Sequence, residues 1–236
     1  MIKAILFDFG QTLVDSSNGF RAAERDAQQK IFTKLDGGGP GWDQFITGYR
    51  HTRKAMHDQS HFSRFEIWHS VHESLDLTVD TEQLLTWERE YWQTVNRLTT
   101  PFPETIRVLE TLQNDYRLAL ISNTQGEVKS DGHRLREFPK IAEFFEVIII
   151  SGEDGIKAKP DPQPFQRCLE SLGITPPAAI YVGDDYRIDV NGARDAGIHP
   201  LWLKHHSLTR NWPQIDTKVP VITNLDALLS LERFLH

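Results

Sequence analysis

The stretch 2–12, IKAILFDFGQT, decides the fold that we expect for this chain. Its first six residues are almost all apolar, and polar residues and a glycine follow at once from Asp8 onward. An apolar run of this length, ended by polar residues, is typical of a buried strand followed by a loop. Asp8 and Thr12 then stand in that loop, four positions apart, with Gly10 between them. The segment therefore predicts a strand that presents a carboxylate at its carboxyl end.

The same pattern recurs along the chain. Five further apolar segments run into polar or glycine-containing stretches, at 117–121 (RLALI), 146–150 (EVIII), 178–182 (AAIYV), 198–203 (IHPLWL) and 219–222 (VPVI). Helix-compatible segments accompany them at 104–114, 161–172, 187–196 and 225–235. Buried strands that alternate with helices predict the α/β class, with a doubly wound, Rossmann-like parallel sheet covered by helices on both faces.

Residues 16–97 interrupt this alternation. They contain no convincing strand, but they hold helix-compatible segments such as 20–35 and 81–97, separated by the glycine-rich break 37–41. The two prolines of 99–104 (TTPFPE) mark the return to the α/β pattern. We therefore predict an all-helical domain at 16–97, inserted into a core domain of 1–15 and 98–236. Most of the tryptophans of the insertion are expected in its core, with one of them a candidate to line a pocket: Trp42, Trp68, Trp87 and Trp92.

Composition narrows the class of protein. A hydrophobic content of 39% and a charged content of 25% are ordinary for a soluble globular protein. The net charge of −7, with acids and bases interspersed, offers no basic face for nucleic acid. Cys168 is the only cysteine, which fits a reducing compartment, and we expect it to be a small buried residue and not a nucleophile. No apolar run approaches the ~20 residues of a membrane span, and the start lacks a signal sequence, so we expect a cytoplasmic protein without membrane or nucleic-acid partners.

Four polar clusters each follow a predicted strand: Asp8–Thr12, Ser122 with Asn123, the segment that leads to Lys159, and Asp184 with Asp185. Ligands of open α/β sheets bind at the carboxyl ends of the strands. Because parallel strands end at the same edge, clusters far apart in the sequence should converge. The complete set points to a binding or catalytic site much more strongly than any single cluster.

In this order the clusters resemble the motifs of the haloacid dehalogenase superfamily, most of whose members are Mg²⁺-dependent phosphatases. The family's D-x-D-G-T, Ser/Thr, Lys and G-D-x-x-x-x-D motifs are matched by DFGQT (Asp8–Thr12), by Ser122 in ISNT, by Lys159 in KPDP, and by Gly183, Asp184 and Asp189 in GDDYRID. The resemblance covers 1–15 and about 98–236, and 16–97 stands where the family carries a helical cap.

The resemblance implies a nucleophile and a metal. Asp8 would attack phosphorus and form an aspartyl-phosphate. Mg²⁺ would neutralise charge on the phosphate, since it prefers hard oxygen ligands. Its ligands would be Asp8, Asp184 and the backbone carbonyl of Gly10, with Asp189 as a further ligand or a close neighbour.

The remaining motif residues would bind the phosphoryl group. Ser122 and Lys159 would hold its oxygens, Lys159 as a point charge. Lys157 competes for that role, but the following Pro-Asp-Pro favours Lys159. Thr12 would donate a hydrogen bond that orients the site, and Asn123 would shape its loop.

Gly10 departs from the family pattern. The family's phosphatases carry a second carboxylate here, which protonates the leaving group and then activates water. General acid–base catalysis contributes about 10²–10⁴-fold, so we expect a slow enzyme in which substrates with good leaving groups suffer least. Gln11 cannot titrate but is a candidate to orient a water near the substrate, whereas Asp15 more plausibly begins the insertion.

Three alternatives stay open. Dehalogenases of the family use an aromatic residue at this position and no metal, which the acids after Gly183 disfavour. Phosphonatases have a small residue here and form a Schiff base with a cap lysine, for which Lys30, Lys34 and Lys54 are available, although none lies in a matching motif. A non-enzymatic descendant would bind phosphate or a partner in the same pocket. The expected substrate is a small phosphorylated metabolite, whose identity the sequence does not give.

Overall fold

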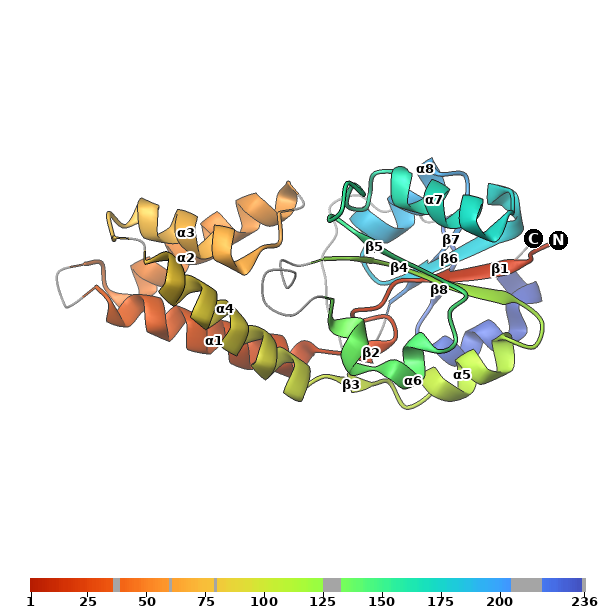
Figure 1. Ribbon diagram of the computed structural model, residues 1–236, viewed down its shortest axis with the longest axis horizontal. Coiled ribbons are helices and arrows are strands. Elements are labelled where there is room, and N and C mark those ends of the chain that lie inside the picture. Colours follow the sequence, from red (N-terminus) through yellow and green to blue (C-terminus); the bar gives the residue numbers. More distant parts are fainter. Residues whose placement is uncertain (36–38, 60, 79, 125–132, 205–217, 235–236) are drawn as a thin grey trace. The chain divides into compact units, whose positions relative to one another are not determined.

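The computed structural model describes residues 1–35, 39–59, 61–78, 80–124, 133–204 and 218–234. The glycine-rich break at 37–41 and the end of the predicted helix 225–235 lie partly outside these residues. Contacts divide the chain into two compact units. The core unit comprises Met1–Asp15, Thr100–Asn123 and Leu135–His236, and the helical unit comprises Ser16–Thr99 and Thr124–Arg134. Figure 1 shows the elements of both.

The core unit is built on a six-stranded sheet in the order β5-β4-β1-β6-β7-β8, in which every neighbouring pair is parallel. Its strands are β1 (Ala4–Phe7), β4 (Arg117–Asn123), β5 (Val147–Ser151), β6 (Ala179–Gly183), β7 (His199–Leu203) and β8 (Val221–Ile222). The chain runs from β1 outward through β4 to β5, and then returns to β6 on the other side of β1. The strand order therefore reverses at β1, which is where open α/β sheets bind ligands.

Both faces of this sheet are buried. In β1, Ile5 and Phe7 pack into one apolar cluster, and Ala4 and Leu6 pack into another. The first cluster includes α5 (Thr105–Leu112) and the C-terminal segment η5 (Leu225–Phe234), and the second includes α7 (Gln163–Leu172) and α8 (Asn191–Asp195). In Figure 1, α7 and α8 lie on one side of the sheet and α5 on the other. Each fully buried large apolar side chain contributes about 1.5–3 kcal/mol. The predicted doubly wound parallel sheet is confirmed.

Two predicted helices differ in type from the prediction. The segment predicted as a helix at 187–196 begins as a π-helical turn, Tyr186–Val190, before α8. The C-terminal segment η5 is a 3₁₀-helix interrupted at Ser230. Its buried leucines, Leu225, Leu228 and Leu231, are spaced by three residues, which matches the three residues per turn of a 3₁₀-helix.

Short elements complete the core unit. An antiparallel pair, β2 (Val14–Asp15) with β3 (Thr100–Pro101), joins the two points where the chain leaves this unit and returns to it. This pair could not be predicted from the apolar pattern, because each strand has only two residues. The remaining elements are the 3₁₀ turns η2 (Arg134–Glu137) and η3 (Pro176–Ala178), and α6 (Pro139–Ala142).

Four helices of the helical unit lie between β2 and β3 in the chain: α1 (Ser17–Thr33), α2 (Trp42–Asp58), α3 (Arg64–Ser74) and α4 (Thr81–Arg97). The predicted all-helical insertion is thus confirmed. The ends of α4 coincide with the predicted 81–97, because Asp80 caps its first turn: the backbone N–H of Gln83 donates to Asp80 Oδ1 at 3.1 Å. Helices α1 and α4 approach closely at Gly19, where a Cβ would lie 2.7 Å from the Val95 carbonyl oxygen.

The tryptophans of this unit do not share one environment. Trp68 and Trp92 are buried in its core, as predicted. Trp87 is half-buried at its margin, whereas Trp42 is 38% exposed. Trp42 begins α2, contacts the rings of Phe32 and Phe45, and lies in the wall of a cavity. Among the described residues, no helix is both long and apolar enough to span a membrane.

Candidate active site

Asp8 lies at the carboxyl end of β1, at the point where the strand order reverses. Its backbone N–H donates to the Val182 carbonyl of β6 at 2.9 Å, so the strand pairing continues one residue past Phe7. Phe7 and Phe9 pack into the α5 side of the sheet. Alternation along the strand turns Asp8 to the opposite face, the face to which Tyr181 belongs. Asp8 is almost fully buried there.

The ammonium group of Lys159 contacts several residues of the site. It donates to Asp8 Oδ1 at 2.8 Å and to Asp189 Oδ1 at 2.7 Å. It also lies 2.7 Å from the Tyr181 hydroxyl and 3.0 Å from the Ile121 carbonyl oxygen. A buried charge is tolerated only when it is paired and hydrogen-bonded. This arrangement meets that condition, and it brings three strand ends, from β1, β4 and β6, to one cation.

Asn123 fixes the backbone of Lys159. The N–H of Lys159 donates to Asn123 Oδ1 at 2.8 Å, and Asn123 Nδ2 donates to the Lys159 carbonyl at 3.0 Å. The Ser151 hydroxyl donates to the same Asn123 oxygen at 2.6 Å, because Ser151 pairs with Asn123 in the sheet. The loop that carries Lys159 is thereby tied to the end of β4, where Ser122 is also buried.

Burial and mutual repulsion shape the electrostatics of the site. Burial raises the pKa of Asp8 to about 6, against the charge of Lys159, which lowers it, and with the charge of Asp189, which adds to the rise. Burial alone would lower the pKa of Lys159, but Asp189 and Asp8 together raise it. Lys159 therefore stays protonated, and a single positive charge faces two carboxylates.

A third carboxylate completes an acidic cluster. Asp8, Asp184 and Asp189 each offer one oxygen, and these oxygens lie within 4.8 Å of one another. Asp189 reaches the cluster through the π-helical turn, and its Oδ2 accepts from the backbone N–H of Asp185 at 2.9 Å. Asp185 itself caps that turn, since its Oδ1 accepts from the Arg187 N–H at 2.9 Å. Three convergent carboxylates can hold a divalent cation.

The loop after Asp8 is compact and strained. Gln11 has a φ of 65°, in the left-handed region that costs a non-glycine residue about 1–3 kcal/mol. Its backbone N–H donates to the Val14 carbonyl at 2.8 Å, and Gly10 forms a β-bridge with Val14. Thr12 is fully buried, and its hydroxyl has no hydrogen-bond partner among the described residues. Such an unsatisfied buried hydroxyl is destabilising by about 1–3 kcal/mol.

Comparison with known proteins identifies the family. Residues 5–203 match the family model described as haloacid dehalogenase-like hydrolase. The chain belongs to this family. The glyceraldehyde 3-phosphate phosphatase of Pyrococcus abyssi is 28% identical over 212 residues, which are 87% of this chain and 82% of that protein. The resemblance inferred from the motifs is confirmed.

Solved structures of haloacid dehalogenase-like hydrolases share the fold. A phosphatase of this family from Thermococcus onnurineus superimposes with a TM-score of 0.63 at 22% identity, covering 99% of both chains. A 2-haloacid dehalogenase from Pseudomonas syringae superimposes with a TM-score of 0.64, also at 22% identity and 99% of both chains. Because the two relatives carry names of different reactions, the fold does not choose between those reactions, and the residues of the site must.

The structure distinguishes between the two lysines that the sequence left in competition. Lys159 lies among the carboxylates, whereas Lys157 is exposed and pairs with Asp161 at 3.0 Å. Sequence analysis missed Tyr181 and Ser151. Ser151 had a signal, as the first polar residue after a predicted strand. Tyr181 is concealed within an apolar strand, where only alternation along β6 indicates its direction.

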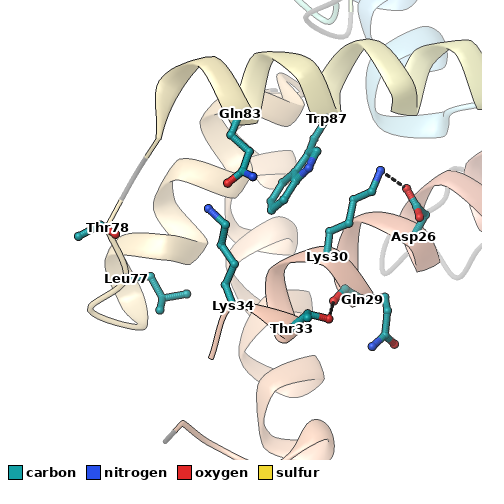
Figure 2. Close-up of a pocket in the computed structure, with 9 residues that line it drawn as sticks. All are labelled: Asp26, Gln29, Lys30, Thr33, Lys34, Leu77, Thr78, Gln83 and Trp87. Carbon is teal, nitrogen blue, oxygen red and sulfur yellow. Dashed lines mark hydrogen bonds and ion pairs between the residues drawn. The ribbon is translucent and has the colours of Figure 1, made fainter. Parts of the chain in front are cut away.

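The helical unit of this haloacid dehalogenase-like hydrolase holds the three lysines that are candidates for the single lysine of a Schiff-base reaction. A cavity of about 600 Å³ lies in that unit. Figure 2 shows Lys30, Lys34 and Trp87 among the residues that line it. Lys30 lies 2.6 Å from Asp26, which holds its pKa above the ordinary value despite partial burial. The ammonium of Lys34 stands 5.1 Å from the Trp87 ring centroid, and Lys54 pairs with Asp58. A Schiff-base lysine must lose its proton, and the raised pKa of Lys30 opposes that loss.

Proposed function

We propose that this haloacid dehalogenase-like hydrolase is a Mg²⁺-dependent phosphatase that cleaves a small phosphorylated metabolite through a phospho-aspartate on Asp8. The observation that carries the proposal is the placement of Asp8, Asp184 and Asp189 around the buried ammonium of Lys159. The name of the Pyrococcus abyssi relative supports a phosphate monoester as the substrate class. The helical segment 16–97 would act as a cap that selects the substrate.

The residues suit a divalent cation. Mg²⁺ takes carboxylate oxygens and waters in octahedral geometry, and the cluster supplies three carboxylates with one lysine to balance them. Asp8, Asp184 and the Gly10 carbonyl would hold the ion. Both oxygens of Asp189 already accept hydrogen bonds from the chain, so Asp189 is better placed to orient Lys159 than to be a principal ligand. When bound, the ion would supply positive charge to the phosphoryl oxygens.

The chemistry proceeds in two displacements. A carboxylate oxygen of Asp8 attacks phosphorus, the P–O bond to the leaving alcohol breaks, and a phospho-aspartate forms. A water then attacks that phosphorus, which releases inorganic phosphate and restores Asp8. Lys159 and Ser122 would hold the phosphoryl oxygens through both steps. The unsatisfied hydroxyl of Thr12 has a hydrogen bond to give once the site is filled.

Gly10 leaves this cycle without its usual proton carrier. The leaving alkoxide must take a proton from water, and the attacking water must lose one without a carboxylate two residues after Asp8. This explains why we expect slow turnover of alkyl phosphates and faster turnover of aryl phosphates, whose leaving groups need no acid.

The test is turnover of an aryl phosphate by the purified protein, with Mg²⁺ or with EDTA. Asp8→Asn, Gly10→Asp and the control Asp115→Asn, which removes an exposed carboxylate of the core unit, are measured beside the native chain. We expect Mg²⁺-dependent turnover that Asp8→Asn abolishes and Asp115→Asn preserves. Gly10→Asp should raise turnover of an alkyl phosphate by about 10²–10⁴-fold, the usual contribution of an acid–base group.

Each contrary result has a definite meaning. Turnover that survives Asp8→Asn would remove the nucleophile from the proposal. Activity that appears only in Gly10→Asp would point to the non-enzymatic descendant, in which the pocket binds phosphate without cleaving it. No turnover in any variant would refute the assignment of the acidic cluster to phosphate chemistry.

A further inference from the structure

A second cavity in the helical unit, of about 630 Å³, lies between α1 and α2. Helix α1 contributes Arg21 and Arg25 to its wall, and α2 contributes Arg50 and Arg53. Residues three or four apart share one face of a helix. The groove is therefore walled by one pair of arginines on each of two neighbouring helices.

The positive charge of this groove is not balanced. Glu24 is the one acid in its wall. It is buried and forms an ion pair with Arg53 at 2.8 Å. Burial would raise the pKa of Glu24, but the guanidinium groups of Arg64 and Arg53 hold that pKa below the ordinary value. Glu24 is thus already shared between two guanidinium groups. Within the described part of the chain, neither Arg25 nor Arg50 forms an ion pair.

Like charges gathered on neighbouring helix faces are destabilising, and the chain as a whole carries a net charge of −7. Four arginines around one cavity therefore contrast with the net negative charge of the chain. A guanidinium group presents a planar fork of donors that matches phosphate and carboxylate oxygens. The groove has the charge and the donor geometry of a site for a polyanion.

Apolar and aromatic side chains share the rest of the wall with Gln28 and Gln29. Phe20 comes from α1, and Ile46 and Trp42 come from α2. Trp42 is 38% exposed although it is a large apolar residue. An aromatic face beside arginines is suited to a flat ring attached to an anionic group, since bases stack on aromatic side chains.

We propose that this groove binds an organic polyphosphate whose phosphates lie on the arginines and whose ring lies on the apolar wall, the chemistry of a nucleoside polyphosphate. The site belongs to the helical unit alone. Neither Asp8 nor a metal ion takes part in it, so it stands or falls independently of the proposed phosphatase activity.

The test is calorimetric titration of the whole protein in EDTA with tripolyphosphate, ATP and adenosine. Arg25→Gln with Arg50→Gln is the test variant. Lys54→Gln with Arg89→Gln is the matched control, because it removes the same charge from exposed residues of the helical unit that are outside the groove wall. Circular dichroism and the melting temperature establish that both double variants fold.

We expect both polyphosphates to bind, ATP about tenfold more tightly than tripolyphosphate because of stacking, and adenosine to bind weakest. The variant Arg25→Gln with Arg50→Gln loses two charge-assisted contacts, which should weaken polyphosphate binding about a hundredfold, at about tenfold for each contact. The control variant should bind with little change in affinity. Trp42→Ala should bring ATP to the affinity of tripolyphosphate. Absence of binding at millimolar ligand, equal loss in the control, or ATP no tighter than tripolyphosphate would each overturn the proposal.

Discussion

Gly183→Ala tests whether the position of Asp189 supports the site. A Cβ at residue 183 would lie 2.4 Å from Asp189 Cγ and 2.6 Å from its Oδ2. Carbon atoms in good contact are about 3.5–4.0 Å apart, so the carboxylate must retreat by about 1 Å. The 2.7 Å bond from Lys159 to Asp189 would then exceed hydrogen-bond length, and the 2.9 Å bond from the Asp185 N–H would be strained.

The loss of stability in Gly183→Ala depends on the hydrogen-bond partners that Lys159 keeps. Breaking a buried ion pair is destabilising by about 3–5 kcal/mol. Lys159 keeps Asp8, the Tyr181 hydroxyl and the Ile121 carbonyl as partners, so we expect the lower end, about 3 kcal/mol. For a chain of this size, 1 kcal/mol shifts the melting temperature by about 2–4 °C, which gives a fall of about 6–12 °C.

Calorimetry of the native protein, Gly183→Ala and the control Gly48→Ala measures this effect. Gly48 lies in α2 with nothing within 4 Å of an added Cβ, so its alanine should stabilise the protein by about 0.5–1 kcal/mol. Aryl-phosphate turnover by Gly183→Ala should fall with its stability, because the displaced Asp189 no longer orients Lys159. A Gly183→Ala variant with native melting temperature and turnover would refute the reasoning that Asp189 holds Lys159 in place.

Three further predictions follow from burial and packing. The pKa of Asp8 in the folded protein, about 6, lies above its ordinary value of 3.8. Protonated Asp8 therefore stabilises the metal-free fold at low pH, and this stabilisation disappears as the pH rises through about 6. Urea unfolding in EDTA at several pH values should show this pH dependence, and Asp8→Asn should lack it. Burial raises the pKa of the Cys168 thiol to about 12, so a thiol reagent should label it only after unfolding. Gly19→Ala places a Cβ 2.7 Å from the Val95 carbonyl oxygen and should destabilise the helical unit by about 1–3 kcal/mol, measured by denaturant unfolding.

The sheet was predictable because burial on both faces leaves long apolar runs. The predicted 117–121 begins with β4 and ends two residues before it, and the predicted 178–182 is displaced from β6 by one residue. The wrong predictions of helix type concern segments in which three or four residues decide the structure. The π-helical turn Tyr186–Val190 depends on the capping of its N–H groups by the Asp185 side chain, which a periodicity of apolar residues does not report.

Most residues of the candidate site could be predicted from the sequence, but the hydrogen bonds between them could not. Polar residues after parallel strands must converge, which is enough to group Asp8 with Lys159 and Asp184. That Asn123 holds the Lys159 backbone through two hydrogen bonds depends on which loop lies over β4. Tyr181 was missed because a tyrosine in an apolar strand indicates burial and gives no sign of the partner of its hydroxyl.

The candidate site holds more negative charge than positive charge. Asp8, Asp184 and Asp189 converge on the single positive charge of Lys159, and burial removes the water that would otherwise screen their repulsion. The raised pKa of Asp8, about 6, is the consequence, because burial and the charge of Asp189 together outweigh the charge of Lys159, which lowers it. A divalent cation would supply further positive charge, lower the pKa of Asp8 and relieve the repulsion together. Gly10 is tolerable in this setting, since a fourth carboxylate would add to the excess of negative charge. Gly10→Asp should therefore gain activity only with Mg²⁺ and lose stability without it, and equal stability of Gly10→Asp and the native protein in EDTA would refute this account.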